Sequence, residues 1–121
     1  MTLTADEFVA HLVETCPELR PCLEEHLQDN EEVLLHLLVA DVLRFAISKF
    51  EESSQDDLAR CLAAVATGLT DGDEQVENAV AVSFVEDTGW WDHTMAPFIA
   101  TWPVALKAEA QRQRAWRKGK P

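Results

Sequence analysis

The sequence predicts an all-α fold: a compact bundle of about six helices, with a kinked C-terminal helical segment and a frayed basic tail. Apolar residues recur at helical spacing in successive stretches, which indicates amphipathic helices rather than strands. Only four of the 121 residues are glycine and five are proline, which favours long helices over the many turns of an all-β domain. A chain of this length can bury a sizeable core as one domain.

The strongest helical signal lies at residues 77–91, with the sequence ENAVAVSFVEDTGWW. Its apolar residues form a broad stripe at helical spacing, so we expect this stretch to be the element around which the chain is organised. Gly89 is expected to end the helix in a left-handed conformation. Trp90 and Trp91 follow, two large side chains that either pack on the body or contact a partner.

The N-terminal half predicts three helices. Thr4 and Glu7 form a capping box that opens the first helix, which ends before Pro17. Pro17 is expected to begin the second helix. The third, at about residues 31–50, is apolar nearly all round and is expected to be the core of the body, with Asn30 as its cap.

The C-terminal half carries further helix signals. Ser54, with Asp57 three residues later, is a capping signal for the fourth helix, and Asp73 is a cap for the fifth. Pro103 breaks the chain after that, and Thr101 is the expected cap of the last helix.

Charge is the unusual bulk property. The net charge is −12, but residues 1–106 hold four basic residues against 21 acidic ones, a balance of −17, while residues 107–121 balance at +5. We therefore divide the chain into an acidic helical domain, residues 1–106, and a basic helix end and tail, residues 107–121. An acidic body repels nucleic acid and anionic lipid and attracts basic proteins. The simpler interpretation is solubility, with the tail folded back on the acidic helices.

The sequence favours a cytoplasmic protein that does not enter a membrane. No apolar run approaches the roughly 18 residues that cross a bilayer, and the N-terminus has no basic segment typical of a signal peptide. The three cysteines are expected to be reduced and structural. Cys22 and His26 have a spacing that suits a metal, but zinc needs three or four ligands, so we expect no metal and no cofactor.

Charged residues within the helices offer few catalytic arrangements. Asp41 and Arg44 are three apart, the spacing of a buried ion pair within one helix. Glu86 and Asp87 either pair as carboxylates in a cleft or contact the basic tail, and His93 lies in a loop beside the tryptophan pair. Motifs of nucleotide binding, nucleophilic hydrolysis and zinc proteolysis are absent, so no catalytic residue is assigned.

Four tryptophans fall within 27 positions: Trp90, Trp91, Trp102 and Trp116. We expect Trp90 and Trp102 in the core and Trp116 exposed, and Trp91 suits either position. Tryptophan is enriched at interface hot spots because it buries a large area with few rotatable bonds. The interaction candidates are Trp90, Trp91, Asp92, His93, Glu86, Asp87 and Trp116.

Several segments resemble small uncharacterised helical proteins of actinobacteria. They are VENAVAVSFVED, WWD and MAPFIATWPVALKAEA, together with CPELRPCLEEHL and LLHLLVAD nearer the N-terminus. The resemblance spans most of the chain and implies a helical fold but no activity. In size and charge such proteins are similar to immunity proteins that neutralise toxins, which is an analogy and transfers no catalytic residue.

The sequence leaves three possible functions. The first is a non-catalytic protein-interaction module, an immunity- or antitoxin-like inhibitor of a basic partner protein. The alternative is a small enzyme or ligand-binding bundle with a carboxylate-lined pocket formed by Asp41, Glu86 and His93. The third is a homodimer in which the basic tail of one chain docks on the acidic body of another.

Overall fold

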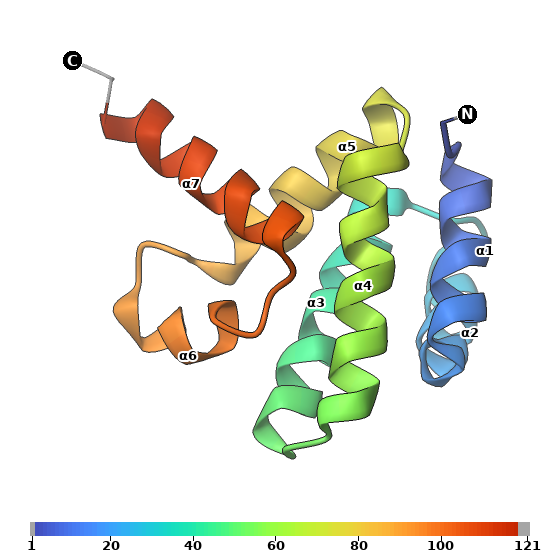
Figure 1. Ribbon diagram of the computed structural model, residues 1–121. Helices are drawn as coiled ribbons and strands as arrows, with labels where there is room; N and C mark the ends of the chain where they lie inside the picture. The colour runs from blue at the N-terminus through green and yellow to red at the C-terminus, as the bar shows by residue number, and fades with distance from the viewer. Residues whose placement is uncertain (1, 119–121) are drawn as a thin grey trace.

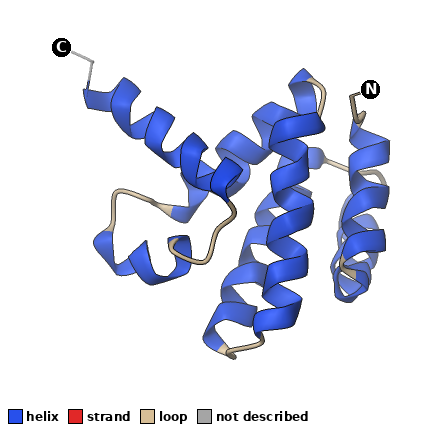
Figure 2. Cartoon of the chain, viewed as in Figure 1, coloured by secondary structure: helices blue, strands red, loops and turns tan. Residues whose placement is uncertain are grey.

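The computed structural model describes residues 2–118, which form helices joined by short loops and contain no strand (Figures 1 and 2). The all-α prediction is therefore confirmed. The α-helices are α1 (Ala5–Thr15), α2 (Arg20–Asn30), α3 (Leu35–Glu51), α4 (Gln55–Asp71), α5 (Glu74–Val80), α6 (Ala96–Ile99) and α7 (Val104–Lys118). Two 3₁₀ turns, η1 (Pro17–Leu19) and η3 (His93–Met95), and one π-helix, η2 (Ala81–Glu86), complete the described secondary structure.

The helices form a body from which the last helix projects. α4 packs against α1, α3 and α5, and α2 packs against α3. The chain then continues through α5 and η2, and α7 returns across η2 with its C-terminal end directed away from α1–α4 (Figure 1).

The continuous helical stretch of α5 and η2 is the centre of this arrangement. It packs against α3, α4 and α7, and α1 also contacts it. Because neighbours cover it on several sides, five of its apolar side chains are fully buried: Val76, Ala79, Val80, Phe84 and Val85. The expectation that the chain is organised around residues 77–91 is met.

This helix is α-helical only as far as Val80, and its next six residues widen into a π-helix. The sequence predicts the helix but not the change in its winding. A π-helix in a longer helix is uncommon and alters which backbone carbonyls are bonded within the helix. Here the Ala81 carbonyl accepts a hydrogen bond from the side chain of Gln113 on α7, at 3.0 Å. Gly89, at φ 78°, lies just beyond the helical residues in the left-handed conformation that the sequence predicts.

The third helix begins later than predicted, at Leu35 instead of residue 31. Asn30 is the last residue of α2, and Glu31 follows it in the left-handed conformation at φ 64°, so Asn30 does not cap α3. The intervening loop is held by His26, whose Nε2 accepts a hydrogen bond from the Leu34 amide at 3.0 Å.

Two of the predicted caps are confirmed. The Thr4 hydroxyl accepts from the Glu7 amide and the Glu7 carboxylate accepts from the Thr4 amide, a complete capping box. Asp73 caps α5 by accepting from the Val76 amide at 2.9 Å. Both caps satisfy amides that a helix N-terminus leaves without a partner.

The predictions for two other caps are wrong, because neither side chain makes a capping hydrogen bond at the helix that it was expected to open. Ser54 occupies the cap position of α4 but makes no capping bond, and Asp57 pairs with Arg60 instead. The Thr101 hydroxyl donates to the Phe98 carbonyl at 2.6 Å and so closes α6 instead of opening α7.

The chain breaks near Pro103 as predicted, and α7 begins at Val104. α7 continues to Lys118, so the fraying expected of the final dozen residues does not begin before that residue. Leu106 and Ala110 are buried against the body and fasten this helix along one face. Residues 119–121, at the end of the predicted tail, lie outside the described part.

The N-terminal arm pairs with the turn between α4 and α5, a contact that no sequence signal indicates. The Leu3 amide donates to the Asp71 carbonyl at 2.7 Å, and the Asp73 amide donates to the Leu3 carbonyl at 2.8 Å. These two bonds form a short parallel bridge between Leu3 and Gly72. They bring the first turn of α1 next to the first turn of α5.

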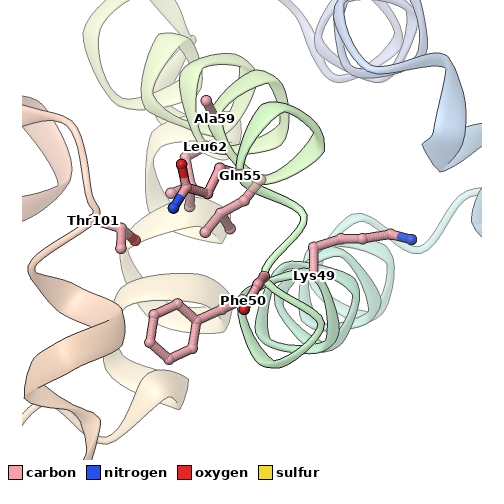
Figure 3. A pocket seen from close by; sticks show the side chains of 8 residues that line it. Lys49, Phe50, Gln55, Ala59, Leu62 and Thr101 are labelled. Carbon is pink, nitrogen blue, oxygen red and sulfur yellow. The ribbon is translucent and has the colours of Figure 1, made fainter.

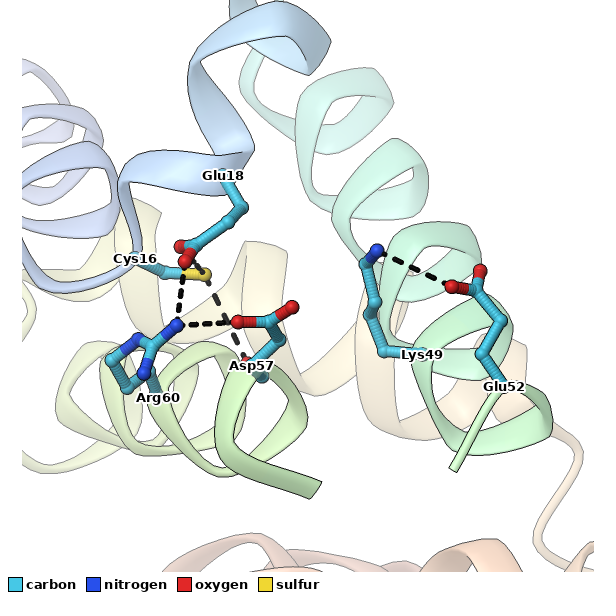
Figure 4. Close-up of polar contacts among 6 residues, drawn as sticks. All are labelled: Cys16, Glu18, Lys49, Glu52, Asp57 and Arg60. Carbon is cyan, nitrogen blue, oxygen red and sulfur yellow. Dashed lines mark hydrogen bonds and ion pairs between the residues drawn. The ribbon is translucent and has the colours of Figure 1, made fainter. Parts of the chain in front are cut away.

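A polar junction joins η1 to the beginning of α4 (Figure 4). Arg60 pairs with Glu18 at 2.5 Å and also with Asp57. The Cys16 thiol donates to Glu18 at 3.4 Å. The backbone amide of Glu18 donates to its own carboxylate, and this bond, with help from Cys16 and Arg60, lowers the pKa of Glu18 to about 2.

The tight packing of α1, α4 and α5 at Gly68 gives a first prediction. An added Cβ at Gly68 would lie 2.7 Å from the Phe8 ring and 2.9 Å from a Val80 methyl, and both side chains are fully buried. Gly68→Ala should therefore lower the free energy of unfolding by about 1–3 kcal/mol, the usual cost of overpacking a core. Urea unfolding followed by circular dichroism measures this change.

Phe8→Leu serves as the internal control for this clash, because it removes the ring atoms that approach Gly68. In the double variant, Gly68→Ala should cost less than in the wild type. An equal cost in both backgrounds contradicts the assignment of the strain to the Phe8 ring.

The polar junction gives a second prediction, on acid stability. Because folding lowers the pKa of Glu18 from its usual 4.5 to about 2, the charged carboxylate stabilises the fold above pH 4.5, and this contribution is lost as the pH falls to about 2. Glu18→Gln should flatten the decline of the urea midpoint over that window. Glu14→Gln, at an exposed position of α1, is the control and should leave the decline unchanged. Equal declines for Glu18→Gln and the wild type rule out the role of Glu18.

Candidate interaction groove between the π-helix and the C-terminal helix

A groove of about 470 Å³ lies between the end of the π-helix and α7. Four of the seven interaction candidates line it, although they come from three separate segments of the sequence. The lining residues are Glu86, Trp90, Trp91, Glu109, Arg112, Gln113 and Trp116. Three indole rings and two carboxylates thus surround one arginine and one amide, which suits recognition of another chain better than covalent chemistry.

Trp90 forms the inner wall of the groove. Its side chain is buried, as predicted, and its indole nitrogen donates to the Gln113 Oε1 at 2.7 Å. The ring of Trp91 meets it edge to face, with the two centroids 5.3 Å apart. The Arg114 guanidinium lies 5.4 Å from the centre of the Trp90 ring, within the range of a cation–π contact.

Gln113 connects α7 to the π-helix. Its amide oxygen accepts from Trp90, and its amide nitrogen donates to the Ala81 carbonyl at 3.0 Å and to the Glu109 carboxylate at 2.9 Å. The side chain thus uses both hydrogens of its amide and its oxygen. No sequence pattern singled out this residue, because a glutamine in a polar helix end is ordinary.

Glu109 is a buried carboxylate that the sequence also did not indicate. Only 6% of the residue is exposed, and Arg112 and Gln113 both donate to it. A buried carboxylate needs such partners to remain charged. Glu109 therefore belongs to the framework of the groove, and its charge is balanced within the chain.

Exposure separates the four tryptophans. Trp90 and Trp102 are buried and Trp116 is 63% exposed, as predicted. For Trp91 the sequence allowed either a core or a surface position, and the structure places it at the surface with 55% of the residue exposed. Trp91 and Trp116 therefore present large apolar surface at the groove.

The other three candidates do not line the groove. Asp87, Asp92 and His93 are exposed on the segment that leads from η2 to α6. Asp92 caps η3 by accepting hydrogen bonds from the amide and the hydroxyl of Thr94, and these bonds lower its pKa. Its role in the described structure is to close a turn.

The ion pair of Asp41 and Arg44 is present, but the prediction that it is buried is wrong. The Arg44 side chain is 70% exposed and the Asp41 side chain 30% exposed. Asp41 also lies 3.6 Å from Nδ1 of His26, a buried histidine. These residues lie around a separate depression that Cys22 also lines.

Another pocket, of about 300 Å³, lies between α3, α4 and the loop before α7 (Figure 3). Its lining combines an apolar floor with a polar rim: Lys49, Phe50, Ser53, Gln55, Leu58, Ala59, Leu62 and Thr101. No carboxylate is among these residues. Asp41 and Glu86 line two different cavities elsewhere and His93 lines neither, so the structure does not bring together the three residues of the expected carboxylate-lined pocket.

The cysteines are free thiols in environments that suppress their reactivity. Cys61 is buried, and burial raises its thiol pKa far above the usual value. Burial also raises the pKa values of Cys16 and Cys22 to about 11, with nearby carboxylates adding to the effect. Across residues 2–118, no group of three or more His, Cys, Asp or Glu side chains is placed to hold a metal ion.

The role of Gln113 gives a third prediction. Gln113→Glu replaces both amide donors by a carboxylate oxygen next to the buried Glu109, so the bonds to Ala81 and Glu109 are lost. The free energy of unfolding should fall by about 2 kcal/mol or more, the cost of leaving buried polar groups without partners. Urea unfolding followed by tryptophan fluorescence measures it.

Gln111→Glu is the matched control, since the same chemical change occurs on α7 at an exposed position outside the groove lining. It should leave the unfolding midpoint within error of the wild type. Equal effects of the two variants contradict the assigned role of Gln113.

Comparison with known proteins identifies a family to which no activity is assigned. No curated protein and no solved structure matches the chain. No helix within residues 2–118 combines the length and the apolar character needed to cross a membrane. A family model described as a domain of unknown function, DUF7674, matches residues 9–117, which include most of the body, all of the groove lining and most of α7. The chain belongs to this DUF7674 family.

Proposed function

We propose that this protein is a non-catalytic interaction module of the cytoplasm that binds a basic partner protein through its acidic body, in the manner of an immunity or antitoxin protein. The observation that carries the proposal is the uncompensated negative charge on the surface of residues 1–106. In this body 21 acidic residues stand against four basic ones. The resemblance to small actinobacterial proteins and their likeness in size and charge to immunity proteins support the same class.

Three of the four basic residues of the body are paired within the chain. Arg44 pairs with Asp41, Lys49 with Glu52, and Arg60 with both Glu18 and Asp57. Three of the four basic side chains are therefore already paired, and most carboxylates face solvent without a basic neighbour from this set. Such a surface attracts a positively charged protein over a long range and accelerates its association at low salt.

One concentrated part of this surface is the acidic end, which we define as Asp6, Glu7, Asp71, Asp73, Glu74 and Glu77. The bridge between Leu3 and Gly72 holds the two segments that carry these residues together. Residues 2–10 and 70–82 contain no lysine, arginine or histidine. Four of the six carboxylates make none of the capping bonds that engage Glu7 and Asp73, so they remain free to pair with lysine or arginine of a partner.

The alternative, a small enzyme or ligand-binding bundle, ranks second. The three residues expected to form its carboxylate-lined pocket lie apart, and the largely apolar pocket between α3 and α4 has no carboxylate in its lining. A general acid or base must lie within hydrogen-bond reach of its reacting partner, and this geometry does not supply such a group.

The fourth prediction tests the acidic end. Tagged full-length protein is used to capture proteins from the lysate of its native host at low and high salt, and the affinity of a retained basic protein is then measured with purified components. A variant neutralises three exposed carboxylates of the acidic end: Asp71→Asn, Glu74→Gln and Glu77→Gln. Its affinity should fall about tenfold at low salt, because each exposed ion pair contributes about 0.5 kcal/mol.

A matched variant carries the same change in net charge at three exposed carboxylates elsewhere: Glu14→Gln, Glu24→Gln and Glu51→Gln. It should retain most of the affinity. Equal losses in the two variants refute the acidic end as the contact surface, and the absence of any salt-sensitive basic partner refutes the proposed function.

A further inference from the structure

The pocket of about 300 Å³ between α3, α4 and the loop before α7 has the composition of a small-molecule site. Its apolar part is formed by the ring of Phe50 and by two buried leucines of α4, Leu58 and Leu62. Three exposed residues with neutral polar side chains form its rim: Ser53, Gln55 and Thr101. Ligand pockets are mostly apolar with a few polar groups, and this volume lies near the lower end of their usual range of about 300–1,000 Å³.

Two sides of the pocket are fixed by one buried residue, Phe98 of α6. The ring of Phe50 meets the ring of Phe98 edge to face, with the centroids 5.6 Å apart. The Thr101 hydroxyl donates to the Phe98 carbonyl at 2.6 Å, and the Phe98 ring also packs against buried Trp102. The cavity therefore has its shape before a ligand enters, which lowers the cost of binding.

The hydrogen-bonding groups of the rim are available to a ligand. The side-chain amide of Gln55 is directed across the cavity toward Thr101 (Figure 3). Within residues 2–118, neither this amide nor the Ser53 hydroxyl makes a hydrogen bond to another residue. A primary amide has two donor hydrogens and an acceptor oxygen side by side, so its best complement is a second carboxamide, which pairs with it through two hydrogen bonds.

The charges around the pocket favour an uncharged ligand. Lys49 is the one charged residue of the lining, and its ammonium group is directed away from the cavity (Figure 3). This group pairs with Glu52 at 3.5 Å and lies 5.4 Å from the centre of the Phe45 ring. A charged ligand would therefore lose water without gaining an opposite charge, which is costly. The exposed carboxylate of Asp56, in the first turn of α4, further disfavours an anion.

We propose that this pocket binds a small uncharged molecule that has one apolar ring and a carboxamide group. The ring lies against Phe50, Leu58 and Leu62, and the carboxamide pairs with the side chain of Gln55. The binding is noncovalent, because the lining supplies no carboxylate, histidine or cysteine for a reaction. No residue of the acidic end lines this pocket, so the inference does not rest on the proposed function.

The fifth prediction compares three probes that share one ring and differ in charge: benzamide, benzoate and benzylammonium. Each is titrated into the full chain and followed by nitrogen–proton NMR. Benzamide should shift the side-chain amide signal of Gln55 and the backbone signals of Ala59 and Thr101 saturably. Its dissociation constant should be about 10 mM or lower, as expected for a ligand of this size. Benzoate and benzylammonium should bind there at least tenfold more weakly, because the lining offers no opposite charge.

Variants at exposed positions locate the binding and test its selectivity. Ala59→Phe fills the cavity and should abolish the benzamide shifts at Gln55 and Thr101. Ala63→Phe, one turn further along α4 and outside the lining, is the matched control and should bind benzamide as the wild type does. Gln55→Glu places a carboxylate at the rim, so benzylammonium should then bind more tightly than benzamide. Circular dichroism checks that each variant is folded.

Three results would overturn the proposal. The first is the absence of saturable shifts with benzamide up to about 50 mM, well above the expected dissociation constant. The second is undiminished binding to Ala59→Phe, which would assign the ligand to another surface. The third is equal affinity for benzamide and either charged probe, which would refute the selection of a neutral ligand. None of these results affects the capture of a basic partner by the acidic end, so the two proposals fail independently.

Discussion

The burial of the α5–η2 helix is the constraint on which the rest of the structure depends. Five of its apolar side chains, from Val76 to Val85, are completely covered, and α3, α4 and α7 each pack against it. Its apolar side chains face these neighbours while Glu74, Glu77 and Glu86 remain exposed, and the neighbours must approach closely. Gly68 on α4 provides that approach, because even one added methyl group there would overlap Phe8 and Val80. The body is therefore assembled around this helix.

The winding of the same helix determines where the groove forms. The π-helical residues carry the Ala81 carbonyl that Gln113 binds, and Gln113 in turn binds Trp90 and Glu109. One amide thus ties the backbone of the central helix to a wall of the groove and to a buried carboxylate of α7. The groove is a consequence of how α7 docks, and it exists only while this docking holds.

The sequence predicts what depends on residues near one another along the chain. Helical periodicity, the capping box at Thr4 and Glu7, the cap at Asp73 and the left-handed Gly89 are all local signals, and all are confirmed. The contacts that build the groove join residues more than 20 positions apart, as between Trp90 and Gln113, and leave no periodic pattern. The late start of α3 has the same origin, because His26 binds the Leu34 amide across a loop whose sequence also suits a helix. Of the four groove residues found in advance, three are tryptophans, which are conspicuous in any sequence, and the fourth is Glu86, a carboxylate at the end of a helix.

The separation of charge along the chain has a structural basis in the break at Pro103. Without this break, α7 would extend α6 in the same direction. The break lets α7 return across η2, and Leu106, Ala110 and Gln113 then fasten it there. Attraction to the 21 acidic residues of the body would otherwise draw the basic helix onto them. Packing and hydrogen bonds therefore fix the position of α7, and within it Arg112 is paired with Glu109 of the same helix.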